Sequence, residues 1–152
     1  MPELATVQRL LIEGVPFNRV LGVRVAAVMD ERADVALPDA PERLNHVGTV
    51  HAAVIFGLGE ATSGAMVLAA FGDLQASGVI PLAAEATIRY RRPSSGELRG
   101  TATLPREGQA RIREEVRQTG RARFTVPVQI MDAAGVVTAE LEVSWALVTK
   151  RD

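Results

Sequence analysis

The chain has 152 residues, of which 47% are hydrophobic and 23% are charged, and its formal net charge is -1. This composition is typical of a folded domain with its own core, because disordered chains are less hydrophobic and more highly charged. A net charge near zero gives no electrostatic reason to expect nucleic acid or an acidic membrane as a partner. The absence of cysteine excludes disulfides, thiolate metal ligands and cysteine nucleophiles, and two histidines are too few for a histidine-built zinc site.

The first residues carry no basic segment followed by an apolar core, so we expect no signal peptide. We expect no membrane span either, because Glu60, Thr62 and Ser63 interrupt the longest apolar stretch. The sequence therefore predicts a cytoplasmic protein with a single domain over residues 1–152, without a metal or a cofactor.

The first third of the chain predicts a helix and then a hairpin. Apolar residues at helical spacing indicate a short amphipathic helix over residues 3–13, which Gly14 and Pro16 end. Residues 21–29 and 33–37 are predicted strands, and the charged residues 30–32 are the turn between them.

Residues 50–71 predict a helix of a different kind. They are apolar on nearly every face and rich in alanine and glycine, whereas a surface helix has a polar side. Such a helix needs other structure around most of its circumference, and we expect a sheet to curl about it.

The remaining residues predict four strands and one surface helix. Period-two alternation marks strands at residues 84–92, 97–104, 121–131 and 136–148, and short turns between late strands favour an antiparallel sheet. Residues 107–119 are highly charged, with Ile112 and Val116 four apart and Gly120 as a stop, which indicates a short surface helix. The predicted fold class is α+β, with one long central helix inside a bent antiparallel sheet.

Glu60 is the one acidic residue in the apolar helix. An ionised carboxylate among apolar neighbours is costly unless it has partners, so Glu60 is either satisfied by the protein or functional, and we favour function. Gly57 and Gly64 lie one turn before and one turn after it, and we expect them to leave space for a ligand.

The start of the same helix is the second candidate element. The amides of His51, Ala52 and Ala53 lie in its first turn and lack intrahelical acceptors. Aligned with the helix dipole, they favour negative charge such as that of an oxyanion. Together with Glu60 they suit acyl transfer.

The segment from Asn45 to Gly64 resembles the signature of hotdog-fold thioesterases of the phenylacetate-pathway type. The residues that match are Asn45, Gly48, Thr49, His51, Ala52 and Ala53, followed by Glu60, Ala61 and Gly64. The resemblance covers roughly residues 17–148, since strand order and hairpin spacing also match. It implies a long helix held in a curled antiparallel sheet.

The resemblance also implies roles for these residues. Glu60 would act as general base or nucleophile, Asn45 would place the water or the thioester, and the Ala52 amide, supported by His51, would polarise the carbonyl. It implies an acyl-CoA or related acyl thioester as substrate, with coenzyme A or an acyl carrier protein only as the thiol part of it. It further implies a homodimer or homotetramer, paired through the edge strand at residues 84–92, with the active site at the subunit interface.

The chain departs from the family pattern in three places. Ala52 and Ala53 stand where many relatives have two glycines. Gly64 stands where some relatives carry a Ser or Thr that holds the water, and Thr62 or Ser63 are the candidates to replace that hydroxyl. The helix at residues 107–119 is an insertion relative to the simplest members, and it resembles a less characterised branch.

Several alternatives stay open. Arg89, Arg91 and Arg92 are either a solvated strand face or contacts for coenzyme A phosphates. His46 lies fourteen positions before Glu60, which is similar to the spacing in fatty-acid dehydratases, so a hydroxyacyl dehydratase is a second possible function. A non-catalytic acyl-CoA-binding protein is the third.

Overall fold

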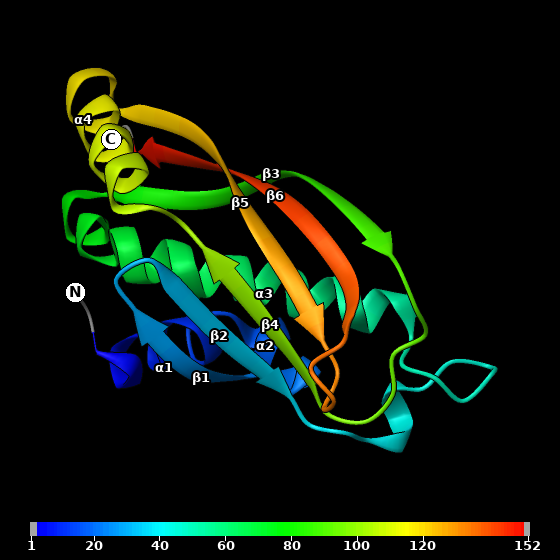
Figure 1. Ribbon diagram of the computed structural model, residues 1–152. Coiled ribbons are helices and arrows are strands. Elements are labelled where there is room, and N and C mark those ends of the chain that lie inside the picture. The colour runs from blue at the N-terminus through cyan, green and yellow to red at the C-terminus, as the bar shows by residue number, and fades with distance from the viewer. Residues whose placement is uncertain (1–2, 151–152) are drawn as a thin grey trace.

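The computed structural model describes residues 3–150. Four α-helices, six strands and two 3₁₀ turns follow one another along the chain (Figure 1). In order they are α1 (Leu4–Ile12), α2 (Pro16–Leu21), β1 (Arg24–Met29), β2 (Arg32–Leu37), η1 (Pro41–Arg43), α3 (Ala52–Phe71), η2 (Gly72–Ser77), β3 (Val79–Tyr90), β4 (Leu98–Thr103), α4 (Arg106–Thr119), β5 (Arg121–Met131) and β6 (Val137–Thr149).

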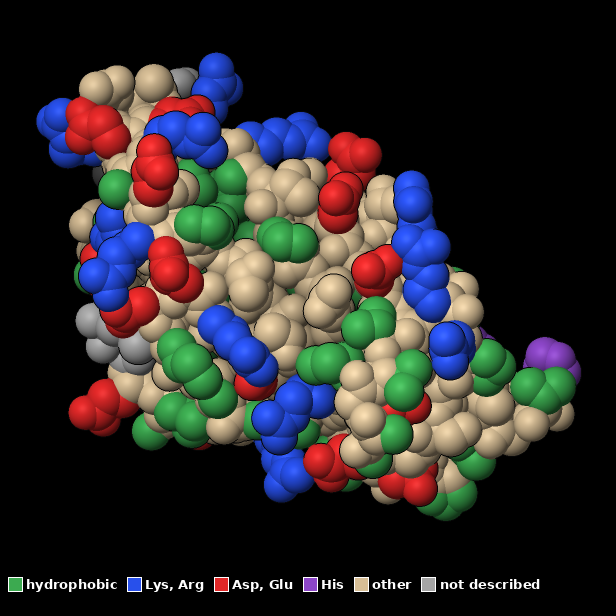
Figure 2. Space-filling view, viewed as in Figure 1, with side chains coloured by type: hydrophobic (Ala, Val, Ile, Leu, Met, Phe, Trp, Pro, Cys, Tyr) green, Lys and Arg blue, Asp and Glu red, His purple; other side chains and the backbone are tan. Residues whose placement is uncertain are grey.

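The strands form one sheet with the order β1-β2-β4-β5-β6-β3, and every neighbouring pair is antiparallel. The sheet arches over α3, while α1 and α2 lie on the side of α3 that the sheet leaves open (Figure 1). The predicted α+β class and the predicted hotdog architecture, a long helix wrapped by a curled antiparallel sheet, are confirmed. On the outer face of the sheet, acidic and basic side chains are intermixed, as the small net charge leads one to expect (Figure 2).

The central helix is buried almost throughout. Every residue from Ala61 to Phe71 is buried, together with Ile55, Gly57, Leu58 and Gly59. By length and composition alone the segment Ala52–Ser77 could cross a membrane, but 78% of its most apolar window is buried inside the fold. Packing against the sheet therefore accounts for its apolar surface.

Two glycines let neighbouring elements approach α3. A Cβ at Gly59 would lie 2.4 Å from Leu141 Cδ2 on β6, and a Cβ at Gly57 would lie 2.9 Å from Leu21 Cδ2 on α2. The prediction that Gly57 leaves space for a ligand is therefore wrong, because Leu21 occupies that space.

The predicted N-terminal helix is confirmed as α1, whose Val7 and Leu11 are buried against the core. The short helix α2 was not predicted; its residue Leu21 was assigned to the following strand. Pro16 stands in its first turn, where a missing amide proton costs nothing. The buried Asn18 of α2 donates from Nδ2 to the carbonyl of Leu11 at 3.0 Å, which ties the two helices together.

Strand β3 is five residues longer at its start than predicted. Its register against β6 shifts between Ala83 and Glu85, so the inward face passes from Val79 and Pro81 before the shift to Ala86 and Ile88 after it. The strand lies at the edge of the sheet, as predicted, and among the strands of residues 3–150 it pairs only with β6. Ile80 and Leu82 are exposed on it.

We expect Gly59→Ala to destabilise the protein, because the added methyl meets the buried side chain of Leu141. Overpacking of this kind costs on the order of 1–3 kcal/mol, against about 1 kcal/mol gained in helix propensity. Gly64→Ala is the matched control, since its Cβ would lie 3.5 Å or more from Leu11 and Trp145, in ordinary contact. Denaturant unfolding should rank Gly64→Ala at or above wild type and Gly59→Ala below it; equal stabilities would contradict this packing.

Candidate active site

A cavity of about 350 Å³ opens beside Glu60 in the middle of α3. On one side it is bounded by α1, α2 and the link between them, and on the other by the start of β3 and by Trp145 of β6. Apart from Glu60 and Trp145, the residues that line the cavity are mostly aliphatic. They are Leu10, Leu11, Gly14, Val15, Asn18, Gly64, Val67, Leu68, Gln75, Pro81, Leu82 and Ala83.

The Glu60 carboxylate has no hydrogen bond or ion pair with any residue that the structure describes, yet its oxygens are not sealed in the core. Burial alone raises the pKa of this carboxyl above its ordinary value. The two readings of Glu60 differed on whether the protein satisfies the carboxylate. Among residues 3–150 nothing does, so its oxygens are available to a molecule in the cavity.

Trp145 was missed by sequence reasoning and forms one wall of this cavity. Its indole Nε1 donates to Ser63 Oγ at 3.0 Å, and Ser63 Oγ donates to the carbonyl of Glu60 at 2.7 Å. The six-membered ring lies 3.6 Å from the position of a Cβ at Gly64. The chain's single tryptophan on the inward face of a strand was the available signal, since a buried indole N–H needs an acceptor.

The two hydroxyls next to Glu60 along the chain point elsewhere. Thr62 is fully buried and donates to the carbonyl of Leu58 at 2.6 Å, and Ser63 is taken up by the bonds to Glu60 and Trp145. Neither lines the cavity, whereas Gly64 does. Of the three residues predicted to contact water or acyl chain, the structure places only Gly64 at the cavity.

At the start of α3 only one of the three predicted amides is available. The His51 amide donates to the carbonyl of Arg43 at 2.8 Å, and the Ala53 amide donates to His51 Nδ1 at 3.0 Å. The Ala52 amide has no acceptor among the described residues. Because Nδ1 of His51 accepts a hydrogen bond, its neutral ring carries the proton on Nε2.

A second group fixes this helix start. The Tyr90 hydroxyl, near the end of β3, donates to the carbonyl of Ala52 at 3.0 Å. Burial raises the pKa of Tyr90, so the hydroxyl keeps its proton and remains a donor.

Asn45 organises the loop that leads into α3. Its Oδ1 accepts from the amides of Val47 at 3.0 Å and Thr49 at 3.1 Å, and its Nδ2 donates to Thr49 Oγ1 at 2.9 Å. The loop projects from the end of the molecule at which α3 begins (Figure 1), and His46 is exposed on it. The structure thus gives Asn45 the contacts of a residue that holds a turn.

The arginine cluster lies away from Glu60. Arg89 and Arg91 line a shallow groove with Glu140 and Glu142, and Arg91 pairs with Glu140 at 2.8 Å. Arg92 is exposed just after Arg91. None of the three lines the Glu60 cavity. Within residues 3–150, no group of three His, Asp or Glu residues is arranged to hold a metal ion.

Comparison with known proteins identifies the family of the chain. Residues 5–147 match the family described as Domain of unknown function (DUF4442). The chain belongs to that family. No curated protein is significantly similar to this DUF4442 member.

Solved structures extend the comparison. A Pseudomonas aeruginosa protein of unknown function, provisionally described as a thioesterase, is 27% identical and has a TM-score of 0.84 over 98% of this chain and 97% of its own. A Mycobacterium tuberculosis protein, provisionally described as an esterase, is 26% identical with a TM-score of 0.69 over 91% and 100%. A Shewanella oneidensis protein, provisionally described as a thioesterase, is 20% identical with a TM-score of 0.80 over 95% and 96%. The resemblance to the hotdog-fold thioesterase superfamily is confirmed.

We expect Glu60→Gln to stabilise the protein at about pH 8 and to have little effect at about pH 4. A carboxyl whose pKa is raised by folding holds its proton more tightly in the native state. Stability therefore falls as the pH rises from the unfolded-state value, about 4.3, through the native-state pKa, and stays lower above it. The glutamine variant has no such loss. Unfolding curves at several pH values test this; a variant less stable than wild type at pH 8 would reveal a partner for the carboxylate.

Proposed function

We propose that the protein hydrolyses an acyl-CoA thioester to the free acid and the thiol, with Glu60 as the general base. One observation carries this proposal: a carboxylate without a protein partner, its pKa raised by burial, faces an apolar cavity large enough for part of an acyl chain. The family's solved relatives described as thioesterases or esterases support the same class of reaction.

The raised pKa suits the chemistry. A carboxylate is a better base toward water as its pKa approaches the working pH. In the proposed step Glu60 takes a proton from a water molecule whose oxygen attacks the thioester carbonyl carbon. The carbon–sulfur bond of the tetrahedral intermediate then breaks, and the proton returns to the leaving thiolate. The products are the carboxylic acid and coenzyme A.

The Ala52 amide is the proposed donor to the carbonyl oxygen. It lies at the N-terminus of α3, where the helix dipole favours negative charge, and it has no acceptor among the described residues. Within one chain, however, Ala52 and Glu60 are eight residues apart on α3. Eight residues are roughly 12 Å along the axis and about 80° around it, so one carbonyl group does not reach both.

A second copy of the chain resolves this separation. Strand β3 has twelve residues and a free edge, and an unprotected edge of that length readily pairs with another strand. Antiparallel pairing of two β3 strands about a twofold axis sets two α3 helices side by side in opposite directions. Glu60 of one subunit then approaches Ala52 of the other. We therefore place two such sites at the interface of a homodimer.

The structure gives less support to the other readings. A dehydratase would need a histidine beside Glu60; His46 does not line the Glu60 cavity of its own chain, so it would have to come from the second subunit. Arg89 and Arg91 lie in a groove that Glu140 and Glu142 also line, which favours their reading as a solvated strand face. A non-catalytic acyl-CoA binder would have the same cavity and would be distinguished by the absence of turnover.

Release of free thiol from short, medium, long and aryl acyl-CoAs tests the activity. We expect wild type to hydrolyse at least one of them and Glu60→Gln to lose at least about a hundredfold in kcat, since it cannot accept a proton. The wild-type kcat/KM should rise with pH through an apparent pKa above the usual glutamate value. Unchanged turnover in Glu60→Gln would refute the assignment. Crotonyl-CoA hydration by wild type would favour the dehydratase.

The composite site is tested by complementation between two inactive variants. Ala52→Pro removes only the amide proton at the first helical position, and the extended conformation of His51 (φ -62°, ψ 139°) accommodates a following proline. Ala52→Gly keeps the proton and serves as control. We expect Ala52→Pro to lose about a hundredfold in kcat. Mixed and re-equilibrated with Glu60→Gln, it should recover about a quarter of wild-type activity, because half of the dimers then contain one intact site. No recovery in a verified mixed dimer would place both groups in one subunit.

A further inference from the structure

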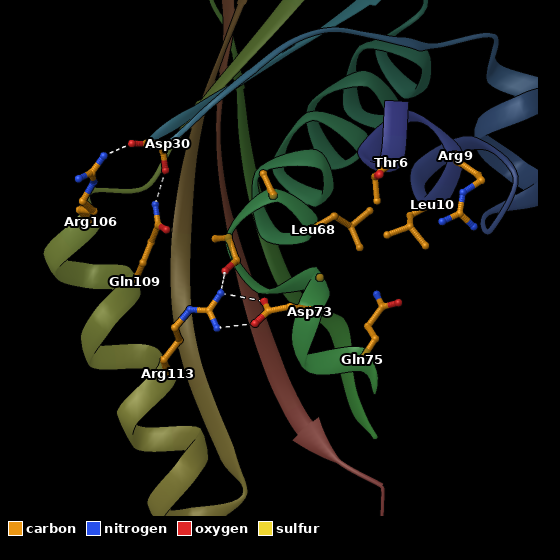
Figure 3. Close-up of a pocket in the computed structure, with 13 residues that line it drawn as sticks. Thr6, Arg9, Leu10, Asp30, Leu68, Asp73, Gln75, Arg106, Gln109 and Arg113 are labelled. Carbon is orange, nitrogen blue, oxygen red and sulfur yellow. Dashed lines mark hydrogen bonds and ion pairs between the residues drawn. The ribbon is translucent and has the colours of Figure 1, made fainter. Parts of the chain in front are cut away.

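A second and larger cavity, of about 750 Å³, lies at the C-terminal end of α3 (Figure 3). It is bounded by α1, the C-terminal turn of α3, η2, α4 and the turn between β1 and β2. Its volume lies in the range of small-molecule sites, roughly 300–1,000 Å³. Leu10, Leu68, Ala69 and Ala70 give it an apolar floor, and charged and amide side chains stand around that floor.

Most of these polar groups are already paired. Arg113 binds both carboxylate oxygens of Asp73, at 2.9 and 2.8 Å, and also the carbonyl of Ala70. Arg106 pairs with Asp30, and Gln109 donates to the carbonyls of Asp30 and Leu104 at 2.7 and 2.8 Å. Figure 3 shows Arg106, Gln109 and Arg113 on the α4 side of the cavity. On that side each positive charge is matched by a negative one.

Arg9 is the exception. It lies on α1, on the opposite side of the cavity from Arg106 and Arg113 (Figure 3). Its guanidinium makes no ion pair or hydrogen bond with any residue in the described part of the chain. Three arginines and two aspartates line the cavity, so one positive charge is unmatched, and it is that of Arg9. The exposed Gln75 points its amide toward the same side (Figure 3).

The two cavities adjoin one another. Leu10, Leu68 and Gln75 line both of them. Glu60 and Leu68 are eight residues apart on α3, so a path of roughly 12 Å along the helix leads from the carboxylate to the entrance of the second cavity. An extended chain of medium length lying between α1 and α3 would have its carbonyl end near Glu60 and its far end near Arg9.

We infer that this second cavity receives the far end of the acyl group and that Arg9 selects acyl chains ending in a carboxylate, so that the substrate class is the ω-carboxyacyl thioester. The inference rests on the proposed thioesterase function. An unpaired guanidinium binds a carboxylate through charge-assisted hydrogen bonds, with an amide donor from Gln75 beside it. A methyl-ended chain of the same length gains nothing from either group. Short acyl chains do not reach Arg9 and carry no preference.

The test compares pairs of CoA thioesters of equal carbon number, one methyl-ended and one ω-carboxylated, over short to long chains. In wild type we expect kcat/KM to favour the carboxylated member by about tenfold at medium length, and not at short length. Arg9→Met should lose that preference and keep its rate on the methyl-ended member. Arg106→Met is the matched control: it removes the same charge from the same cavity on the paired side, and it should keep the preference. Equal rates for both members in wild type, or a preference that survives Arg9→Met, would overturn the inference.

Two further measurements separate the possible causes of failure. Pantetheine thioesters lack the nucleotide phosphates of coenzyme A. If the effect of Arg9→Met vanishes with them, Arg9 binds a phosphate and the inference is wrong. Calorimetric binding of free α,ω-dicarboxylic acids to wild type and Arg9→Met needs no turnover. Binding that Arg9→Met weakens supports the cavity's role even if no thioester is hydrolysed, whereas dicarboxylic acids that bind both proteins equally, or neither, refute it. The failure of the proposed function itself appears separately, as absence of thiol release from every thioester.

Discussion

The fold depends on hiding a helix of twenty residues that has no polar stripe. A sheet that covers one side of such a helix is not enough, so six strands curl around it and two short helices close the remaining side. The closeness of this packing comes from glycine. Leu141 from β6 fills the place of a side chain at Gly59, and Leu21 from α2 does the same at Gly57. These two contacts fix the helix along its axis and around it. The position of Glu60, between Gly59 and Ala61, is thereby set by the core and not by any bond of its own.

Ion pairs hold several of the charged side chains, but neither of the two candidate residues. Asp34 is held by Arg32, Asp73 by Arg113 and Glu140 by Arg91. Glu60 and Arg9 have no such partner among the described residues, and they line two adjoining cavities. For Glu60 the lack of a partner costs stability in the ionised state, because burial opposes the charge. A protein that keeps an unpaired buried carboxylate at that cost retains a group free to react, which is a common feature of active sites.

The sequence predicted the architecture well because periodicity reports directly on burial. The all-round apolar character of residues 50–71 indicated the enclosed helix, and alternation located β5 and β6 to within a residue. Helix α2 was missed because Leu21 and Val23 continue an apolar run that looks like the start of a strand. The first half of β3 was missed because the register shift after Ala83 breaks the alternation and Pro81 interrupts it.

Glu60 was predictable as a lone charge in an apolar segment. Thr62 and Ser63 could not be oriented, since a helix that is apolar on all sides gives no sign of which side faces which neighbour. The second cavity, which Arg9 lines, is formed by residues of α1, α3 and α4. No local sequence pattern connects residues so far apart in the chain.

The order in which the chain is made has a consequence for how it folds. Helix α3 precedes β3, β4, β5 and β6 along the chain, and the sheet that covers it is complete only when β6, the last element, is in place. Strand β3 has no partner in its own chain until β6 arrives between it and β5. During synthesis, a helix apolar enough for a membrane therefore emerges from the ribosome well before the strands that shelter it. Closing the sheet through such distant segments is slow compared with forming local contacts. The nascent chain thus passes through a stage in which its most hydrophobic segment is exposed, and the risk of aggregation is greatest at that stage.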